Sequence, residues 1–121
     1  MLSITKRFEF CYGHHLPDYN GKCRNVHGHG SFLEVELIST ETTRKLNTYN
    51  GMILDFSDLK RLVNETVVNK LDHRYLNDFI PIPTAENIME WVVTELQNVF
   101  GHSLIRVRMS ETPDSWVEWR K

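Results

Sequence analysis

Two runs of alternating apolar and polar residues, 2–14 and 27–38, constrain the fold more than any other feature of the sequence. Apolar side chains occupy the even positions of the first run and the odd positions of the second, from Leu33 to Leu37. A period of two residues is typical of a β-strand with one buried face. The segment between the runs, 16–26, is rich in turn formers: Pro17, Asp18, Asn20, Gly21 and Asn25. We therefore predict two strands joined by a loop.

The middle of the chain has the spacing of helices instead. After Asp55, a candidate cap, apolar residues recur at helical spacing as far as Leu71, and they do so again between Thr84 and Gly101. Alternation returns over 105–111 and, beyond a turn, over 115–120. The order strand, strand, helix, helix, strand, strand predicts an α+β fold: a four-stranded antiparallel sheet with both helices on one face. The open edges of such a sheet favour pairing with other chains.

Length and charge narrow the class of protein. The 121 residues fit one domain, 1–121, and the net charge of -2 comes from interleaved acidic and basic residues, a pattern that argues against a nucleic-acid partner. No apolar run approaches the ~20 residues that span a bilayer. The N-terminus does not resemble a signal sequence, so we expect a cytoplasmic protein whose two cysteines, Cys11 and Cys23, are free thiols.

Three histidines lie on the same face as the apolar side chains of the two N-terminal strands. His27 and His29 project from the same side of one strand, and His14 at the end of the other meets them if the strands pair. Three neutral imidazoles without a fourth protein ligand are typical of a catalytic zinc site. The alternative is a turn-rich strand start whose histidines make ordinary hydrogen bonds. The shared parity with His14 favours the metal site.

Cys23 is a candidate base in the loop before His27. Lys22 and Arg24 flank it, and nearby cations favour the thiolate form. The alternative is an incidental loop cysteine. Cys11 lies on the opposite, outward parity of its strand, and we expect it to be structural or incidental.

Two further groups carry carboxylates. Asp72 stands beside His73 after the first helix, and an adjacent carboxylate can orient an imidazole for proton transfer, although such pairs also occur at ordinary helix ends. Glu111 ends an otherwise apolar strand face, where it needs hydrogen-bond donors. A planar ligand with paired N–H groups would supply them. The alternative is a carboxylate that turns to solvent or bonds the turn at Thr112.

Together these residues resemble the 6-pyruvoyltetrahydropterin synthase and 6-carboxytetrahydropterin synthase family. The matching motifs run over nearly the whole chain: Phe8-Glu9-Phe10 with His14 and Leu16-Pro17, Cys23-x3-His27-Gly28-His29-Gly30, Asp55-Phe56-x2-Leu59-Lys60, Leu71-Asp72-His73-x-Tyr75-Leu76-Asn77, Pro83-Thr84-x-Glu86, and Glu111-Thr112. Each motif is weak alone, and their joint order is specific. The resemblance implies the tunnelling fold (T-fold), in which subunits join their sheets into a barrel, usually as a homohexamer built as a dimer of trimers with active sites between subunits.

The resemblance also implies a role for each site residue. It implies zinc (Zn2+) held by His14, His27 and His29; catalysis by Cys23, with Asp72 and His73 as a relay pair; and a pterin substrate anchored by Glu111, with Thr112 beside it. The implied substrate is the small molecule 7,8-dihydroneopterin triphosphate.

Two reactions divide the family. One keeps the three-carbon side chain and gives 6-pyruvoyltetrahydropterin; the other releases acetaldehyde and gives 6-carboxytetrahydropterin, on the route to the 7-deazaguanine of queuosine. The short gap between Cys23 and His27 resembles the carboxy branch, which we favour. One departure is Cys11-Tyr12-Gly13, where the family usually has small residues such as alanine.

Two different classes of protein could carry the same residues. One is a non-catalytic pterin- or metal-binding module that retains the fold. The other is a cysteine hydrolase that uses Cys23, His73 and Asp72 as a triad. The joint presence of the thiol, the relay pair and Glu111 favours the lyase over both.

Overall fold

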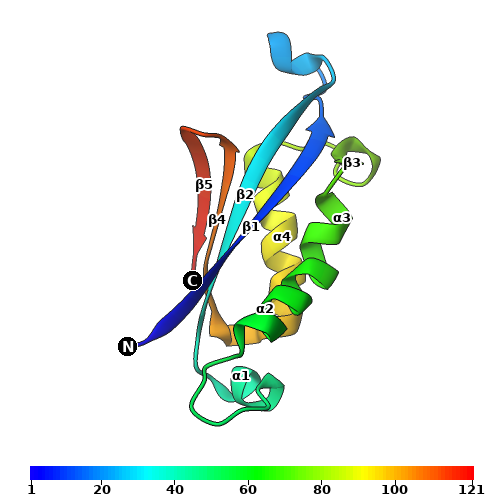
Figure 1. Cartoon of the computed structure of the whole chain (residues 1–121). Helices are drawn as coiled ribbons and strands as arrows, with labels where there is room; N and C mark the ends of the chain where they lie inside the picture. The colour runs from blue at the N-terminus through cyan, green and yellow to red at the C-terminus, as the bar shows by residue number, and fades with distance from the viewer.

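In a computed structural model that describes residues 1–121, the strands form one five-stranded sheet in the order β3-β1-β2-β4-β5 (Figure 1). The strands are β1 (Ser3–His14), β2 (His27–Ile38), β3 (Arg74–Tyr75), β4 (Leu104–Thr112) and β5 (Ser115–Arg120). β3 runs parallel to β1, and the remaining pairs are antiparallel. The α+β class and the four predicted strands are confirmed. The purely antiparallel, four-stranded sheet is corrected, because the two residues of β3 are too few to show any alternation.

Both predicted helices pack on one face of the sheet (Figure 1). The first consists of α2 (Phe56–Val63), a π-helical turn η2 (Asn64–Val68) and α3 (Asn69–Leu71), and the second is α4 (Ala85–Phe100). The sequence did not indicate α1 (Glu41–Leu46), whose six residues are mostly polar. Three short 3-10 turns complete the chain: η1 (Lys22–Arg24), η3 (Leu76–Asp78) and η4 (Gly101–Ser103). None of the helices has both the length and the apolar composition to cross a membrane.

Side-chain caps fix where the two long helices begin. The Asp55 carboxylate accepts a hydrogen bond from the backbone N–H of Ser57, and the Thr84 hydroxyl accepts one from that of Asn87. Caps of this kind satisfy N–H groups that the first helical turn leaves free. Thr84 thereby fixes the position of the residue before it, Pro83, at the edge of the histidine cluster.

The core lies between the sheet and these helices, and the pairing of β1 with β2 extends its inner face to the histidines. Tyr12 pairs with His29, and His14 pairs with His27. The apolar side chains of the same face, such as Phe8, Phe10 and Leu33, are buried against the helices. The three histidines therefore stand at the end of the core, as the parity predicts.

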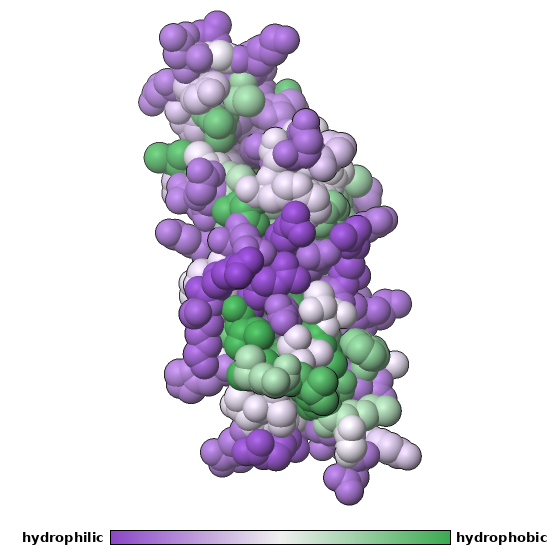
Figure 2. Space-filling view, turned by 90° about the vertical axis from the view of Figure 1, so that its left-hand side faces the viewer, coloured by the Kyte–Doolittle hydropathy of each residue, from purple (hydrophilic) through white to green (hydrophobic).

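The outer face of the sheet is hydrophilic across its middle (Figure 2). Arg106 donates to Glu36 at 2.8 Å and to Glu118 at 3.0 Å, and Arg7 forms an ion pair with Glu34 at 2.7 Å. These bonds cross from strand to strand. This face is therefore stabilised by charge pairs, while the opposite face carries the core and the histidines.

Candidate functional site

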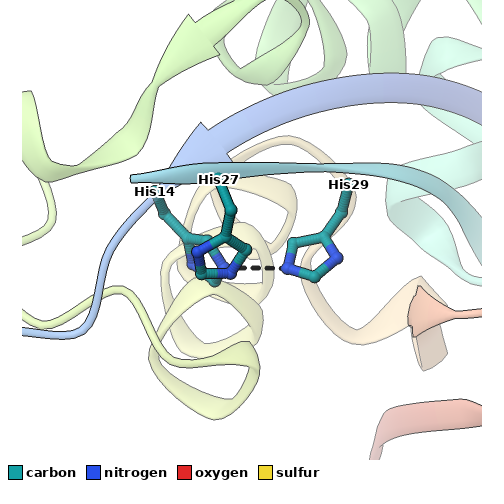
Figure 3. Close-up of side chains that lie close together, drawn as sticks. All are labelled: His14, His27 and His29. Atoms are coloured by element: carbon teal, nitrogen blue, oxygen red, sulfur yellow. Dashed lines mark hydrogen bonds between the residues drawn. The ribbon is translucent and has the colours of Figure 1, made fainter. Parts of the chain in front are cut away.

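His14, His27 and His29 form one cluster (Figure 3). Each offers a ring nitrogen, and these three atoms lie within 4.8 Å of one another. His14 is 1% exposed and is the most buried of the three. In a tetrahedral zinc site with bonds of 2.0–2.1 Å the ligand nitrogens stand about 3.3 Å apart, so small side-chain rotations would bring them into place.

Backbone carbonyls hold two of the rings in the orientation that a metal requires. His14 Nδ1 donates to the carbonyl of Pro83 at 2.8 Å, and His27 Nδ1 donates to that of Asn25 at 2.7 Å. In neutral rings this leaves each Nε2 with a free lone pair. His27 Nε2 is buried without a partner, and His29 Nε2 lies 3.0 Å from His14 Nε2. An orphaned buried nitrogen in a cluster of imidazoles fits a zinc ion that still has a position open for another ligand.

Two rings of the cluster, those of His14 and His29, are also held in the neutral form that binds a metal. Burial lowers the pKa of His14 below its ordinary value, although the bond to Pro83 opposes the shift. Burial likewise lowers the pKa of His29, against the opposing charge of Glu111. Both rings therefore stay unprotonated at neutral pH.

Glu111 lies beside the cluster, as expected from its place on β4. Its Oε1 is 3.8 Å from the Nε2 atoms of both His14 and His29, and its side chain is one-third exposed. The carboxylate therefore faces both the metal position and solvent. A ligand placed there could offer N–H groups to Glu111 while another part of it reaches the histidines.

Tyr12 is a further residue of this cluster that sequence reasoning missed. Its ring centroid lies 5.2 Å from that of His14 and 5.5 Å from that of His29. The side chain is buried, and its hydroxyl has no hydrogen-bond partner. Burial, and then the charge of Glu111, raise the pKa of Tyr12, so it is a neutral phenol. Its even-numbered position two residues before His14 was the available signal, because a β-strand period of two places both on one face.

Asp72 and His73 lie along the edge of β1 that faces away from β2. Asp72 Oδ1 accepts from the backbone N–H of Cys11 at 2.9 Å, and the backbone N–H of His73 donates to the Cys11 carbonyl at 2.6 Å. His73 Nδ1 is 3.0 Å from Asp72 Oδ1, and the His73 side chain is largely exposed. The Cys11 N–H, and then His73, hold the pKa of Asp72 below its ordinary value. The predicted pair is thus formed, with an ionised carboxylate beside the imidazole.

His73 lines a pocket of about 920 Å³ together with His27 and His29. Its lining comes from the ends of β1 and β2 and from β3: Cys11, Tyr12, Gly13, Val26, His27, Gly28, His29, His73, Arg74 and Tyr75. No hydrogen bond or ion pair joins His73 to the histidine cluster. His73 therefore shares a pocket with His27 and His29 without bonding to either of them.

Cys23 and Thr112 also lie apart from the histidine cluster. Cys23 is on η1 in the loop that projects beyond the ends of β1 and β2 (Figure 1), and it neither joins the metal-binding group nor lines the pocket. Thr112 donates from its hydroxyl to Asp114 at 2.9 Å in the turn between β4 and β5. The roles predicted for these two residues stay predictions.

This sheet with its helices and histidine cluster belongs to a known fold. The solved structure of a 6-pyruvoyl tetrahydropterin synthase from Caenorhabditis elegans superimposes with a TM-score of 0.81 over 99% of this chain and 95% of that chain, at 23% sequence identity. The tunnelling fold expected from the sequence is therefore confirmed.

The sequence then defines the family. The family model described as 6-pyruvoyl tetrahydropterin synthase matches residues 3–121, and the chain belongs to this family. A protein of Archaeoglobus fulgidus named putative 6-carboxy-5,6,7,8-tetrahydropterin synthase is 45% identical over 112 residues, covering 93% of this chain and 90% of the relative. The 6-carboxy-5,6,7,8-tetrahydropterin synthase of Synechocystis is 38% identical over 114 residues, covering 93% and 88%. A 6-pyruvoyl tetrahydrobiopterin synthase of Poecilia reticulata is 31% identical over 107 residues, covering 83% and 70%.

Proposed function

We propose that this protein is a zinc-dependent 6-carboxytetrahydropterin synthase, a lyase. It converts 7,8-dihydroneopterin triphosphate to 6-carboxy-5,6,7,8-tetrahydropterin and releases acetaldehyde and triphosphate, on the route to the 7-deazaguanine of queuosine. One observation carries the proposal: His14, His27 and His29 converge with Nε2 of His27 buried and unpartnered, next to the carboxylate of Glu111. The names of relatives at 38–45% identity support the carboxy product.

Each residue of the cluster has a task in this reaction. His14, His27 and His29 hold the zinc ion, which when bound acidifies the C–H groups next to the side-chain hydroxyls of the substrate. Glu111 accepts hydrogen bonds from the N–H groups of the pterin ring, which fixes the ring beside the histidines. The carboxylate is a suitable anchor because it has only acceptor oxygens and lies partly open to solvent.

Proton transfer is assigned to Cys23, Asp72 and His73. The Cys23 thiolate removes a proton from the substrate side chain, and His73 carries protons to and from the reacting atoms. Asp72, ionised and 3.0 Å from His73 Nδ1, orients that ring. The exposure of the His73 side chain leaves room for a ligand to approach it.

The assembly that we propose is a homohexamer, a dimer of trimers, with active sites between subunits. Cys23 at the tip of the β1–β2 loop and His73 at the edge of β1 are not part of the group that could hold a metal in their own chain, and neither bonds to its histidines. The sheet keeps two open edges. The outer edge of β5 has no partner strand, and β3 covers only the Tyr12–Gly13 portion of the outer edge of β1. Pairing of edges between chains would bring Cys23 of one chain and His73 of another to the same histidine cluster.

The alternative product is 6-pyruvoyltetrahydropterin. The 31% identity with the 6-pyruvoyl tetrahydrobiopterin synthase of Poecilia reticulata supports this alternative. Incubation of the zinc-loaded protein with 7,8-dihydroneopterin triphosphate, followed by mass spectrometry, separates the two. Acetaldehyde together with 6-carboxytetrahydropterin is the expected result. A pyruvoyl product would keep the site chemistry and change the pathway, and the absence of any conversion would support a non-catalytic binding module.

A further inference from the structure

The hydroxyl of Tyr12 is buried without any hydrogen-bond partner. In the whole molecule only one other buried side-chain polar atom has none, Nε2 of His27, which the metal would use. Tyr12 is 3% exposed, so solvent does not satisfy its hydroxyl. A buried hydroxyl without a partner destabilises the folded chain. The two unpartnered atoms belong to the same cluster, which indicates that groups bound at this site satisfy them: a metal for His27 and a second ligand for Tyr12.

Packing alone does not explain a tyrosine at this position. Its ring stacks on Phe10 at 5.8 Å between centroids and meets His14 edge-on. A phenylalanine would fill the same space and make the same ring contacts without an orphaned hydroxyl. Tyr75 shows the contrast, because its hydroxyl lies 2.5 Å from Nδ1 of His15 and is satisfied within the protein.

The proposed ligand has groups that match this hydroxyl. Glu111 offers only acceptor oxygens, which suit the N–H groups of a pterin ring, and the histidine nitrogens would be occupied by the metal. The side chain at C6 of a neopterin carries hydroxyls, and each of them can accept a hydrogen bond. Among the side chains whose rings contact both His14 and His29, Tyr12 supplies a neutral O–H donor.

We propose that the Tyr12 hydroxyl donates a hydrogen bond to a side-chain hydroxyl of the pterin held in front of His14 and His29. Tyr12 is then a ligand-binding residue that fixes how the C6 side chain lies against the metal position. The inference rests on the proposed function, since it takes the pterin as the ligand of this site.

Two pterins and one substitution test the proposal. Neopterin carries the hydroxylated side chain, whereas 6-methylpterin has the same ring system and no side-chain hydroxyl. Binding of each to the zinc-loaded protein is measured by pterin fluorescence, for the unchanged chain and for Tyr12→Phe. We expect Tyr12→Phe to weaken neopterin binding about tenfold, the effect of one lost hydrogen bond, and to leave 6-methylpterin binding unchanged. Equal neopterin affinities in the two proteins would overturn the proposal.

Thermal unfolding of the metal-free proteins separates this role from a structural one. Tyr12→Phe removes an orphaned hydroxyl, so its Tm should equal or exceed that of the unchanged chain. Tyr75→Phe, the matched control, removes a bonded hydroxyl and should lower Tm. A lower Tm or a lower zinc content for Tyr12→Phe would also overturn the proposal, because the hydroxyl would then act within the protein. If the unchanged protein bound neither pterin, the proposed function itself would fail.

Discussion

The protonation state of His14 and His29 decides when the site can hold a metal. Burial lowers the pKa of both rings below the ordinary value of 6.5. Between the lowered values and about 6.5 the unfolded chain binds more protons than the folded chain, so the free energy of unfolding of the metal-free protein falls as the pH falls through this window. We therefore expect the zinc-loaded protein to keep its metal at pH 6.5 and to release it only in more acidic solution.

Dialysis against buffers of decreasing pH, followed by metal analysis, measures the release. Urea unfolding of the metal-free protein over the same pH range measures the stability. Zinc release centred above pH 6.5, or a stability that rises as the pH falls towards 6, would contradict the burial of these rings as neutral imidazoles.

Cys23 and Cys11 offer a matched pair of substitutions. Cys23→Ala should leave the fold and the zinc content unchanged, because its thiol makes no contact with the histidines, and should remove most turnover because the proposed base is gone. Cys11→Ala should keep most turnover, since Cys11 holds Asp72 and His73 through its backbone. Initial rates with 7,8-dihydroneopterin triphosphate compare the two. Full activity of Cys23→Ala would refute its assignment as the base.

At the scale of elements, the start of α4 supports the metal site. Thr84 caps this helix, and the carbonyl of the preceding Pro83 accepts the hydrogen bond from His14. Thr84→Ala should therefore lower the free energy of unfolding by about 1 kcal/mol and also weaken zinc retention.

Asp55→Ala is the control for this prediction. It removes the cap of α2, which supplies neither a histidine of the cluster nor a hydrogen-bond partner of one, so it should destabilise the protein by a similar amount and leave zinc retention unchanged. Denaturant unfolding and competition with a zinc chelator give the two quantities. Equal zinc affinities for Thr84→Ala and Asp55→Ala would show that the cap does not orient His14.

How well the sequence predicted each element depended on the element's length. β1 and β2 have twelve residues each, long enough for their period of two to reveal the buried face and the cluster of His14, His27 and His29. β3 has two residues, and its pairing with β1 depends on backbone hydrogen bonds that no pattern of side chains reports. The lack of a hydrogen-bond partner for the Tyr12 hydroxyl could not be predicted either. The period of two predicts which face of the strand a side chain lies on, but not which polar groups it meets there.

At the scale of the whole molecule, the proposed hexamer predicts the mass of the particle and the activity of mixed assemblies. Six chains of 14.3 kDa should give a particle of about 86 kDa. If each site takes Cys23 from one subunit and His73 from another, co-expressed Cys23→Ala and His73→Ala chains should regain turnover in about a quarter of their sites by random pairing. Light scattering and activity of the co-purified mixture test both. A mixture as inactive as its parents would contradict shared sites.

Some features of the protein could be predicted from the sequence, and the contacts between chains could not. Family and fold followed from motifs spread over the chain, and the site residues on one sheet face followed from parity. In the proposed assembly the gathering of Cys23 and His73 with the histidines depends on contacts between chains, which one sequence does not report. The oligomer, the cytoplasmic location and the identity of the metal stay predictions.

His73 adopts a backbone φ of 58°, a left-handed conformation in which glycine alone is free of side-chain crowding. The hydrogen bond from its N–H to the carbonyl of Cys11 holds the chain in this conformation. Random substitution followed by selection for heat resistance would therefore favour glycine at this position. Selection for growth that depends on the enzyme would keep the imidazole. In the proposed mechanism, heat tolerance and proton transfer therefore compete at His73, and a more heat-stable variant of this protein should be engineered elsewhere in the chain.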